Sequence, residues 1–223
     1  INALLIIAPK GVYKNWYDSE IPIHLPDHID KKIVLWKTSD KSVKQLKILN
    51  TLFESGTDLR ILIMNVESFS SGDGASFAYK FLLAHPKSMI AIDEATTIKT
   101  PTSNRTKNII ALRNLCKYRR ILTGSPVTKS PLDLFSQCLF LDPWLLDHQS
   151  FYTFKARYSI CKKIQVNGRQ IEIIVGYRNL SELSDKVAKF SKRVLKEDCL
   201  DLPEKTYVKH YVELTKEQQQ VYK

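Results

Sequence analysis

Residues 89–94 read MIAIDE, a short apolar run that ends in two adjacent acids, Asp93 and Glu94. No further acid occurs until Asp133. A carboxylate at the end of a buried strand is costly unless it is paired, hydrogen-bonded or bound to a metal. This pair of acids is therefore the first candidate for a functional site.

Short β-prone runs alternate with helical patterns on both sides of this stretch. Most of the β-prone runs are almost entirely apolar, as in parallel strands buried on both faces. Such alternation predicts an α/β fold with a mostly parallel sheet, helices on both of its faces, and ligands at the carboxyl ends of the strands. Strands are expected at 3–8, 32–36, 60–64, 89–93, 118–123 and 207–213, and helices at about 12–20, 41–54, 75–84, 103–116 and 131–140.

The pattern changes after Asp142-Pro143. Helices are expected at 151–160 and 180–198. The Asn167-Gly168 pair between them, flanked by β-prone residues, predicts a hairpin with a type I′ turn. The sequence thus indicates a main lobe at 1–143, a helical and β-hairpin protrusion at 144–200, and at 201–223 a strand that returns to the sheet, followed by the start of a helix.

The charge distribution points to a polyanionic partner. The chain of 223 residues carries 34 basic and 23 acidic residues, a net charge of +11. The segment from Lys99 to Arg120 holds seven basic residues and no acid. Nucleic acid is the usual partner of such a surface, although a solvated basic face is the plain alternative. Residues 186–196 are expected to form a basic helix of this kind.

Several classes of protein are disfavoured by composition. The four cysteines are far apart and include no C-x-x-C pair, so free thiols in a reducing compartment are expected and zinc is not. No apolar run approaches about 18 residues, so no membrane partner is expected. The opening INALLIIAPKG is interpreted as a strand and not as a signal peptide. These features predict an intracellular protein, in a cytoplasm or a nucleus.

A strand that ends in Asp-Glu is the arrangement in which the aspartate holds Mg²⁺ and the glutamate orients or deprotonates a water that attacks a phosphate. An Asp-Glu pair at a strand end is by itself weak evidence for such a site, because a surface strand end or a helix cap can have the same sequence. Residues 122–126, LTGSP, follow the next expected strand. Small hydroxyl residues and a glycine there allow a tight loop to approach a phosphate, although an ordinary β-turn also fits.

Together these motifs resemble the first RecA-like lobe of superfamily 2 helicases, specifically the Swi/Snf-related DNA translocases. DEAT (93–96) is similar to the DEAH-type motif II, and LTGSP is similar to motif III, LTGTP. The other similar stretches follow in the family's order and are LLIIAPKGVYKNWYDSE (4–20, motif Ia), ILIMNVESF (61–69, motif Ib), IKTPTSNRTK (98–107) and KRVLKEDCLDLPEKTYVKHYVELTKEQQQVY (192–222).

The resemblance implies a RecA-like three-layer sandwich in a motor that uses ATP and Mg²⁺ to move on double-stranded DNA. Asp93 would hold Mg²⁺ through ATP, and Glu94 would activate water. Residues implied to couple nucleotide to DNA are Thr96, Thr123, Gly124 and Ser125. Residues implied to lie along the DNA are Pro9, Lys10, Asn65, Ser68, Lys99, Ser103, Asn104, Arg105, Arg193 and Lys196, with Ala8 and Glu67 beside them.

Three departures from the family pattern stand out. Thr96 takes the place of the motif II histidine, Thr100 takes the place of an asparagine, and G-x-x-x-x-G-K-[ST] is absent from the chain. We therefore expect a fragment without its P-loop and second lobe, which alone would bind ATP poorly and hydrolyse it negligibly.

Two other functions fit parts of the pattern. One is a non-catalytic DNA-binding or scaffold module, against which the intact Asp93-Glu94 pair argues. The other is an RNA helicase or the motor subunit of a restriction enzyme, against which segment 193–222 argues. The three tryptophans, Trp16, Trp36 and Trp144, are expected in the core or at interfaces and not as platforms for bases.

Overall fold

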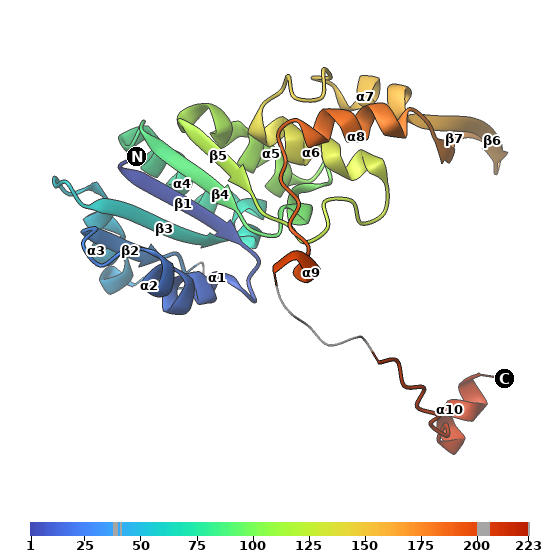
Figure 1. Ribbon diagram of the computed structural model, residues 1–223, viewed down its shortest axis with the longest axis horizontal. Coiled ribbons are helices and arrows are strands. Elements are labelled where there is room, and N and C mark those ends of the chain that lie inside the picture. Colours follow the sequence, from blue (N-terminus) through green and yellow to red (C-terminus); the bar gives the residue numbers. More distant parts are fainter. Residues whose placement is uncertain (38–39, 41, 200–205, 223) are drawn as a thin grey trace. The chain divides into compact units, whose positions relative to one another are not determined.

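The computed structural model describes residues 1–37, 40, 42–199 and 206–222, except for the side chains of Lys196 and Glu197 (Figure 1). The chain divides into two compact units, Ile1–Lys189 and Phe190–Lys223. The first unit contains the whole five-stranded sheet and the predicted protrusion as far as residue 189. The predicted boundaries at residues 143 and 200 stay predictions.

Five parallel strands form the central sheet in the order β2-β3-β1-β4-β5 (Figure 1). Five of the six expected strands are therefore confirmed, within one or two residues at each end. Because all five strands are parallel, their carboxyl ends lie along one edge of the sheet. The strands are β1 (Ala3–Ala8), β2 (Lys31–Leu35), β3 (Leu59–Asn65), β4 (Ser88–Ile92) and β5 (Tyr118–Ile121).

Alternate residues of the strands enter two separate cores, as the period of two in a strand requires. In β1, Leu5 and Ile7 belong to one core and Ile6 and Ala8 to the other. The first core is closed by α3 (Val43–Asn50), α4 (Gly72–Ala84), α5 (Asn104–Leu112) and α6 (Leu134–Leu141). The second is closed by α1 (Tyr13–Asn15), the π-helix η1 (Trp16–Glu20) and α2 (Ile21–His24). The predicted three-layer α/β sandwich is confirmed.

Short 3₁₀ turns complete the connections in this unit. They are η2 (Thr51–Phe53), η3 (Val66–Ser70), η4 (Ala95–Ile98), η5 (Arg113–Leu115) and η6 (Pro131–Asp133). Two of them, η3 and η4, begin directly after β3 and after the acids that follow β4. They therefore determine how the chain leaves the carboxyl edge.

The protrusion consists of α7 (Phe151–Tyr158), the hairpin β6 (Ser159–Val166) and β7 (Arg169–Tyr177), and α8 (Leu180–Ala188) (Figure 1). At the hairpin tip, Asn167 has φ 50° and Gly168 has φ 76°. Two successive positive φ angles are those of a type I′ turn, so the predicted hairpin is confirmed.

Glu182 of α8 connects the parts of the protrusion. Its carboxylate accepts hydrogen bonds from Arg157, from the Tyr158 hydroxyl (2.9 Å) and from Lys186 (3.0 Å). Lys186 also pairs with Asp147 at 3.1 Å. The bonds from Arg157, Lys186 and Tyr158 lower the pKa of Glu182 from its usual 4.5 to about 2. Burial alone would lower the pKa of Lys186, but its bonds to Glu182, Asp147 and Tyr158 raise it.

Two sequence expectations fail in the second unit or at its border. The helix expected at 180–198 ends at Ala188, and residues 191–195 are not helical before the short α9 (Lys196–Cys199) begins. The prediction of one continuous basic helix at 186–196 is therefore wrong. Its like charges three and four positions apart repel along a helix, and the one buried residue of α8 is Leu183, far from this end.

The strand expected at 207–213 is also not formed. Residues 206–215 belong to no strand, and α10 (Lys216–Val221) follows, with the predicted helix start capped by Thr215 and Gln218. A strand needs a neighbour that takes up its backbone N–H and C=O groups. The described part of the second unit supplies none.

Burial in α4 yields a stability prediction. Leu82 is fully buried and its neighbour Leu83 is 62% exposed. We expect Leu82→Ala to lower the free energy of unfolding by about 2–5 kcal/mol, because it leaves a cavity in the first core. Leu83→Ala, with the same change in helix propensity, should cost no more than about 0.5 kcal/mol. Urea unfolding of both variants checks the pair, and equal losses would contradict the assignment of the core face.

The Glu182 network predicts a pH dependence. Because the pKa of Glu182 is depressed in the folded state, its contribution to stability is present above pH 4.5 and is lost as the pH falls towards about 2. Glu182→Gln should therefore be less stable than the parent protein at pH 7, with a difference that shrinks between pH 4.5 and 2. Urea unfolding at several pH values measures this. Glu213→Gln, at an exposed position, is the control and should show no such trend.

Candidate active site

Most of the residues predicted for the site follow strands and so gather along one edge of the sheet. Pro9 and Lys10 follow β1, Asp93 and Glu94 follow β4, and Thr123 lies two residues beyond β5. The Asp93 backbone N–H donates to the Ile7 carbonyl at 2.8 Å, so the chain is still paired with β1 where the acids begin. The adjacency of these segments is a consequence of parallel pairing.

Both oxygens of the Asp93 carboxylate are held. Oδ1 accepts the backbone N–H of Glu94 at 2.9 Å, and Oδ2 accepts the indole Nε1–H of Trp16 at 2.9 Å. Each carboxylate oxygen has two lone pairs, so each keeps one position for another ligand. Two donors thus orient the group without exhausting its capacity to bind a cation.

Glu94 occupies the left-handed region, with φ 48° and ψ 60°. This conformation is uncommon for a residue other than glycine, and such residues cluster at functional sites. It is held here by the Glu94 N–H bond to Asp93 and by the Thr97 N–H bond to the Glu94 carbonyl at 2.9 Å. The strained turn leaves the Glu94 side chain exposed while Ala95 is buried directly after it.

The acids are joined to the LTGSP loop through the backbone. Leu122 N–H donates to the Ile92 carbonyl at 2.8 Å, and Ala95 N–H donates to the Leu122 carbonyl at 3.0 Å. The Thr96 side chain makes no hydrogen bond to this loop within the described part of the chain. A shift of Leu122 would therefore reach the acids through main-chain bonds and not through Thr96.

The loop itself is held by its own hydroxyls. The Thr123 hydroxyl accepts the Ser125 N–H at 3.3 Å, and the Ser125 hydroxyl donates to the Val127 carbonyl at 2.9 Å. A Cβ placed on Gly124 would meet no atom within 4 Å. The glycine therefore faces open space, where a ligand has room to approach its backbone.

Lys99 is engaged by its own chain. Its ammonium group bonds the Thr128 hydroxyl and lies 3.8 Å from an oxygen of Asp133. Burial alone would raise the pKa of Asp133, but the N–H groups of Lys129 and Thr128 and the Thr128 hydroxyl lower it overall. A phosphate that binds Lys99 would therefore share its ammonium group with the carboxylate of Asp133.

The start of α5 presents another part of the predicted DNA surface. Ser103 caps the helix by accepting the Thr106 N–H at 3.3 Å, and the exposed Asn104 and half-buried Arg105 form its first turn. A helix N-terminus favours an anion, and Arg105 adds a positive charge there. The predicted phosphate contact of this segment stays a prediction.

Asn65 and Ser68 differ from the expectation that they lie along DNA. They are 6% and 1% exposed, and the Asn65 Oδ1 accepts both the Ser68 N–H (2.8 Å) and the Ser68 hydroxyl (2.5 Å). The motif caps η3 internally, so both side chains are used within the fold. The neighbouring Glu67 is exposed.

The remaining predicted residues have separate locations. Lys10 is exposed beside the half-buried Pro9, whose carbonyl accepts the N–H groups of Val12 and Tyr13 at 2.9 Å each. Arg193 is exposed in the second unit. The side chain of Lys196 lies outside the described residues.

Sequence reasoning missed Trp16 as part of this site. The sequence analysis predicted a core or interface tryptophan, and the ring does pack on the second core. Its N–H, however, is bonded to Asp93. A half-buried indole usually has a partner for its single donor, but sequence spacing did not reveal which acceptor the fold would supply.

Asp93 and Glu94 fit a magnesium ion that is held jointly by protein and nucleotide. Mg²⁺ prefers one or two carboxylates, substrate phosphates and water over an all-protein cage. The described residues contain no group of three or more metal-binding side chains. The phosphate cradle of a P-loop is not encoded in the 223 residues.

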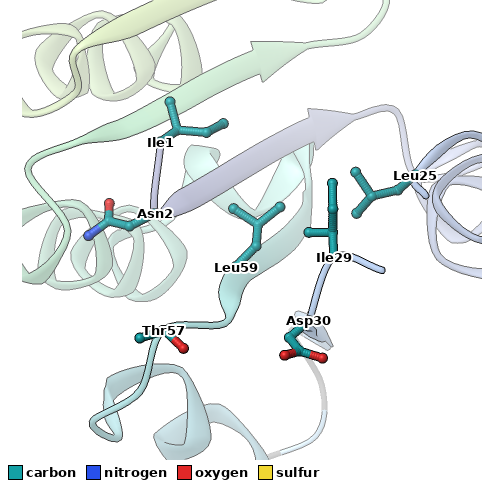
Figure 2. Close-up of a pocket in the computed structure, with 7 residues that line it drawn as sticks. All are labelled: Ile1, Asn2, Leu25, Ile29, Asp30, Thr57 and Leu59. Atoms are coloured by element: carbon teal, nitrogen blue, oxygen red, sulfur yellow. The ribbon is translucent and has the colours of Figure 1, made fainter. Parts of the chain in front are cut away.

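A separate pocket lies at the opposite edge of the sheet. Figure 2 shows the residues that line it, which include Asn2 before β1, Asp30 before β2, and Leu59 at the start of β3. It is bordered by the amino ends of the strands, whereas ligands of parallel α/β sheets bind at the carboxyl ends. The pocket is therefore distinct from the candidate site.

The SNF2-related domain matches residues 1–223. The chain belongs to the SNF2-related family. Motifs II and III, which follow neighbouring strands, had indicated this SNF2-related family in the sequence. That resemblance is confirmed. No helix among the described residues is both long and apolar enough to cross a bilayer.

Relatives of this SNF2-related chain are much longer proteins. "Chromatin-remodeling ATPase INO80" of Arabidopsis thaliana is 25% identical over 221 residues, 98% of this chain and 14% of that protein. "Helicase-like transcription factor" of Mus musculus is 23% identical over 225 residues, 99% and 20% of the two chains. Among solved structures, a Sulfolobus solfataricus SWI2/SNF2 ATPase core in complex with dsDNA is 25% identical, with a TM-score of 0.48, and the match covers 70% of this chain and 28% of that one.

A residue used within the fold and a residue that contacts DNA should respond differently to substitution, and Asn65 and Lys10 test this difference. Asn65→Ala removes the acceptor of two buried hydrogen bonds, so the free energy of unfolding should fall by about 1–3 kcal/mol. The salt dependence of duplex binding should not change. Lys10→Ala should leave stability unaltered and reduce the slope of log affinity against log salt by about 1. Urea unfolding and duplex titrations at several salt concentrations test both, and a reversed outcome would return Asn65 to the DNA surface.

Proposed function

We propose that this chain is part of an ATP-dependent motor that moves on double-stranded DNA. The observation that carries the proposal is that Ile92 and Ala95, on either side of the two acids, are both joined to Leu122 by main-chain hydrogen bonds at the carboxyl edge. A carboxylate pair at this edge suits a nucleotide site. Membership of the SNF2-related family supports the same activity.

In this proposal each acid has one task. When bound, Mg²⁺ neutralises charge on the nucleotide phosphates. Asp93, oriented by Trp16 and Glu94, binds the ion. Glu94 projects from its left-handed turn and accepts a proton from, or orients, the attacking water. The proposed coupling residues are Thr96, Thr123, Gly124 and Ser125, and Leu122 is the main-chain link between their loop and the residues beside the acids.

Duplex DNA would bind along exposed and half-buried polar and basic side chains of the same edge. Lys10, Asn104 and Arg105 are the contacts that the geometry supports best, and Lys99 would contribute while shared with Asp133. Arg193 and Lys196 of the second unit complete the set by resemblance. Binding through phosphates is independent of sequence and falls steeply with salt.

The rest of the motor would come from other parts of the full-length protein. The chain spans 14% of the Arabidopsis thaliana relative and 20% of the Mus musculus relative. We propose a P-loop and a second RecA-like lobe outside these residues, with 1–143 as the main lobe, 144–200 as a protrusion and 201–223 as a connection. An intracellular location follows from a DNA substrate.

The test is duplex-stimulated ATP hydrolysis by the full-length protein. Glu94→Gln removes the proton acceptor, so kcat should fall about 100-fold or more, while affinity for duplex stays the same. Glu54→Gln is the matched control, because Glu54 is exposed and precedes the amino end of β3. It should hydrolyse ATP like the parent protein.

Two outcomes would contradict the motor. Full-length protein that binds duplex but never hydrolyses ATP would favour a DNA-binding scaffold. Stimulation by RNA but not by duplex DNA would favour an RNA helicase.

A further inference from the structure

Trp16 connects the first helical segment of the chain to the acid after β4. Its Nε1–H donates to Asp93 Oδ2 at 2.9 Å, across 77 residues of sequence. The ring packs against the second core, which includes Ile6, Tyr13 and Ile21. The apolar body is therefore held in place, and the single polar atom of the side chain is directed at the carboxylate.

The helix around Trp16 is widened at this point. Residues Trp16–Glu20 form a π-helix, in which the Ile21 N–H donates to the Trp16 carbonyl five positions earlier. Pro22 explains the widening, because a proline ring clashes with the carbonyl four residues before it in an ordinary α-helix. Single π turns relieve such conflicts and are frequent at functional sites. Trp16 is the first residue of this wide turn.

The same helical segment begins at the loop that follows β1. The Pro9 carbonyl accepts the N–H groups of Val12 and Tyr13, at 2.9 Å each, and Tyr13 is buried in the second core. Lys10 lies exposed within that turn. A short, hydrogen-bonded turn thus links Lys10 to the helical segment that carries Trp16.

We propose that Trp16 is a positioning residue for Asp93 and couples the loop at Lys10 to the orientation of the magnesium-binding carboxylate. The proposal rests on the motor function proposed above, in which Lys10 contacts duplex DNA. Without the Trp16 N–H, Asp93 is oriented by the Glu94 N–H alone, and its Oδ2 turns freely. Duplex bound at Lys10 then no longer changes the orientation of the Asp93 carboxylate towards the ion.

The experiment compares two tryptophans in the full-length protein. Trp16→Phe removes the N–H and keeps an aromatic ring. Trp36→Phe is the matched control, because the Trp36 N–H is buried without a partner in the described structure and its ring packs on Phe77 at 4.9 Å. The readout is the Mg²⁺ concentration that gives half-maximal binding of a fluorescent, non-hydrolysable ATP analogue, with and without duplex.

Trp16→Phe should raise this Mg²⁺ concentration about 10-fold, as loss of an outer partner of a metal ligand does. Binding of the analogue in EDTA should be unchanged. Duplex should lower the Mg²⁺ requirement of the parent protein and of Trp36→Phe, but not that of Trp16→Phe. If Trp16→Phe does not fold, 3-benzothienylalanine at position 16 keeps the shape of the indole and removes only the donor.

Two results would overturn the proposal. One is a Mg²⁺ requirement of Trp16→Phe within 2-fold of that of the parent protein. The other is an equal shift in both variants, which would make the effect one of general packing. A parent protein that shows no Mg²⁺-dependent binding of the analogue would instead overturn the proposed motor, and the role of Trp16 with it.

Discussion

The arrangement of this protein depends on the parallel pairing of β4 between β1 and β5. The bond from Asp93 N–H to the Ile7 carbonyl and the bond from Leu122 N–H to the Ile92 carbonyl extend that pairing to the last residues of the strands. They bring the acids, the loop after β1 and the loop after β5 to one edge. The position of Asp93 beside the segment that carries Trp16 depends on this register.

The polar groups at that edge divide into two kinds. Asn65, Ser68 and, in part, Lys99 satisfy groups of their own chain, because a buried donor or acceptor without a partner is costly. Glu94, Lys10 and Asn104 remain exposed. Asp93 belongs to both kinds, since two donors orient it and two acceptor positions remain. The supporting side chains of this site are therefore held by hydrogen bonds, and the exposed side chains are accessible to ligands.

Two backbone distortions lie at residues of the candidate site. The backbone of Glu94 is held in the left-handed region. The helical segment at Trp16, near the start of the chain, is widened by Pro22. Both distortions are stabilised by packing next to them, of Ala95 in the first core and of Tyr13 and Ile21 in the second. They direct one carboxylate outwards and one indole N–H towards the other carboxylate.

The sequence by itself determined the order of the five strands of the sheet and of the helices between them, the hairpin at Asn167-Gly168 and the candidate acids, because these follow from apolar periodicity and from turn chemistry that acts over a few residues. Only the tertiary structure decided which side chains meet. The Trp16 bond to Asp93 spans 77 residues and depends on strand register and a π turn. The burial of Asn65 depends on η3 folding back on β3, and the absent strand at 207–213 depends on a neighbour. Contacts between distant residues are set by packing, which local patterns do not encode.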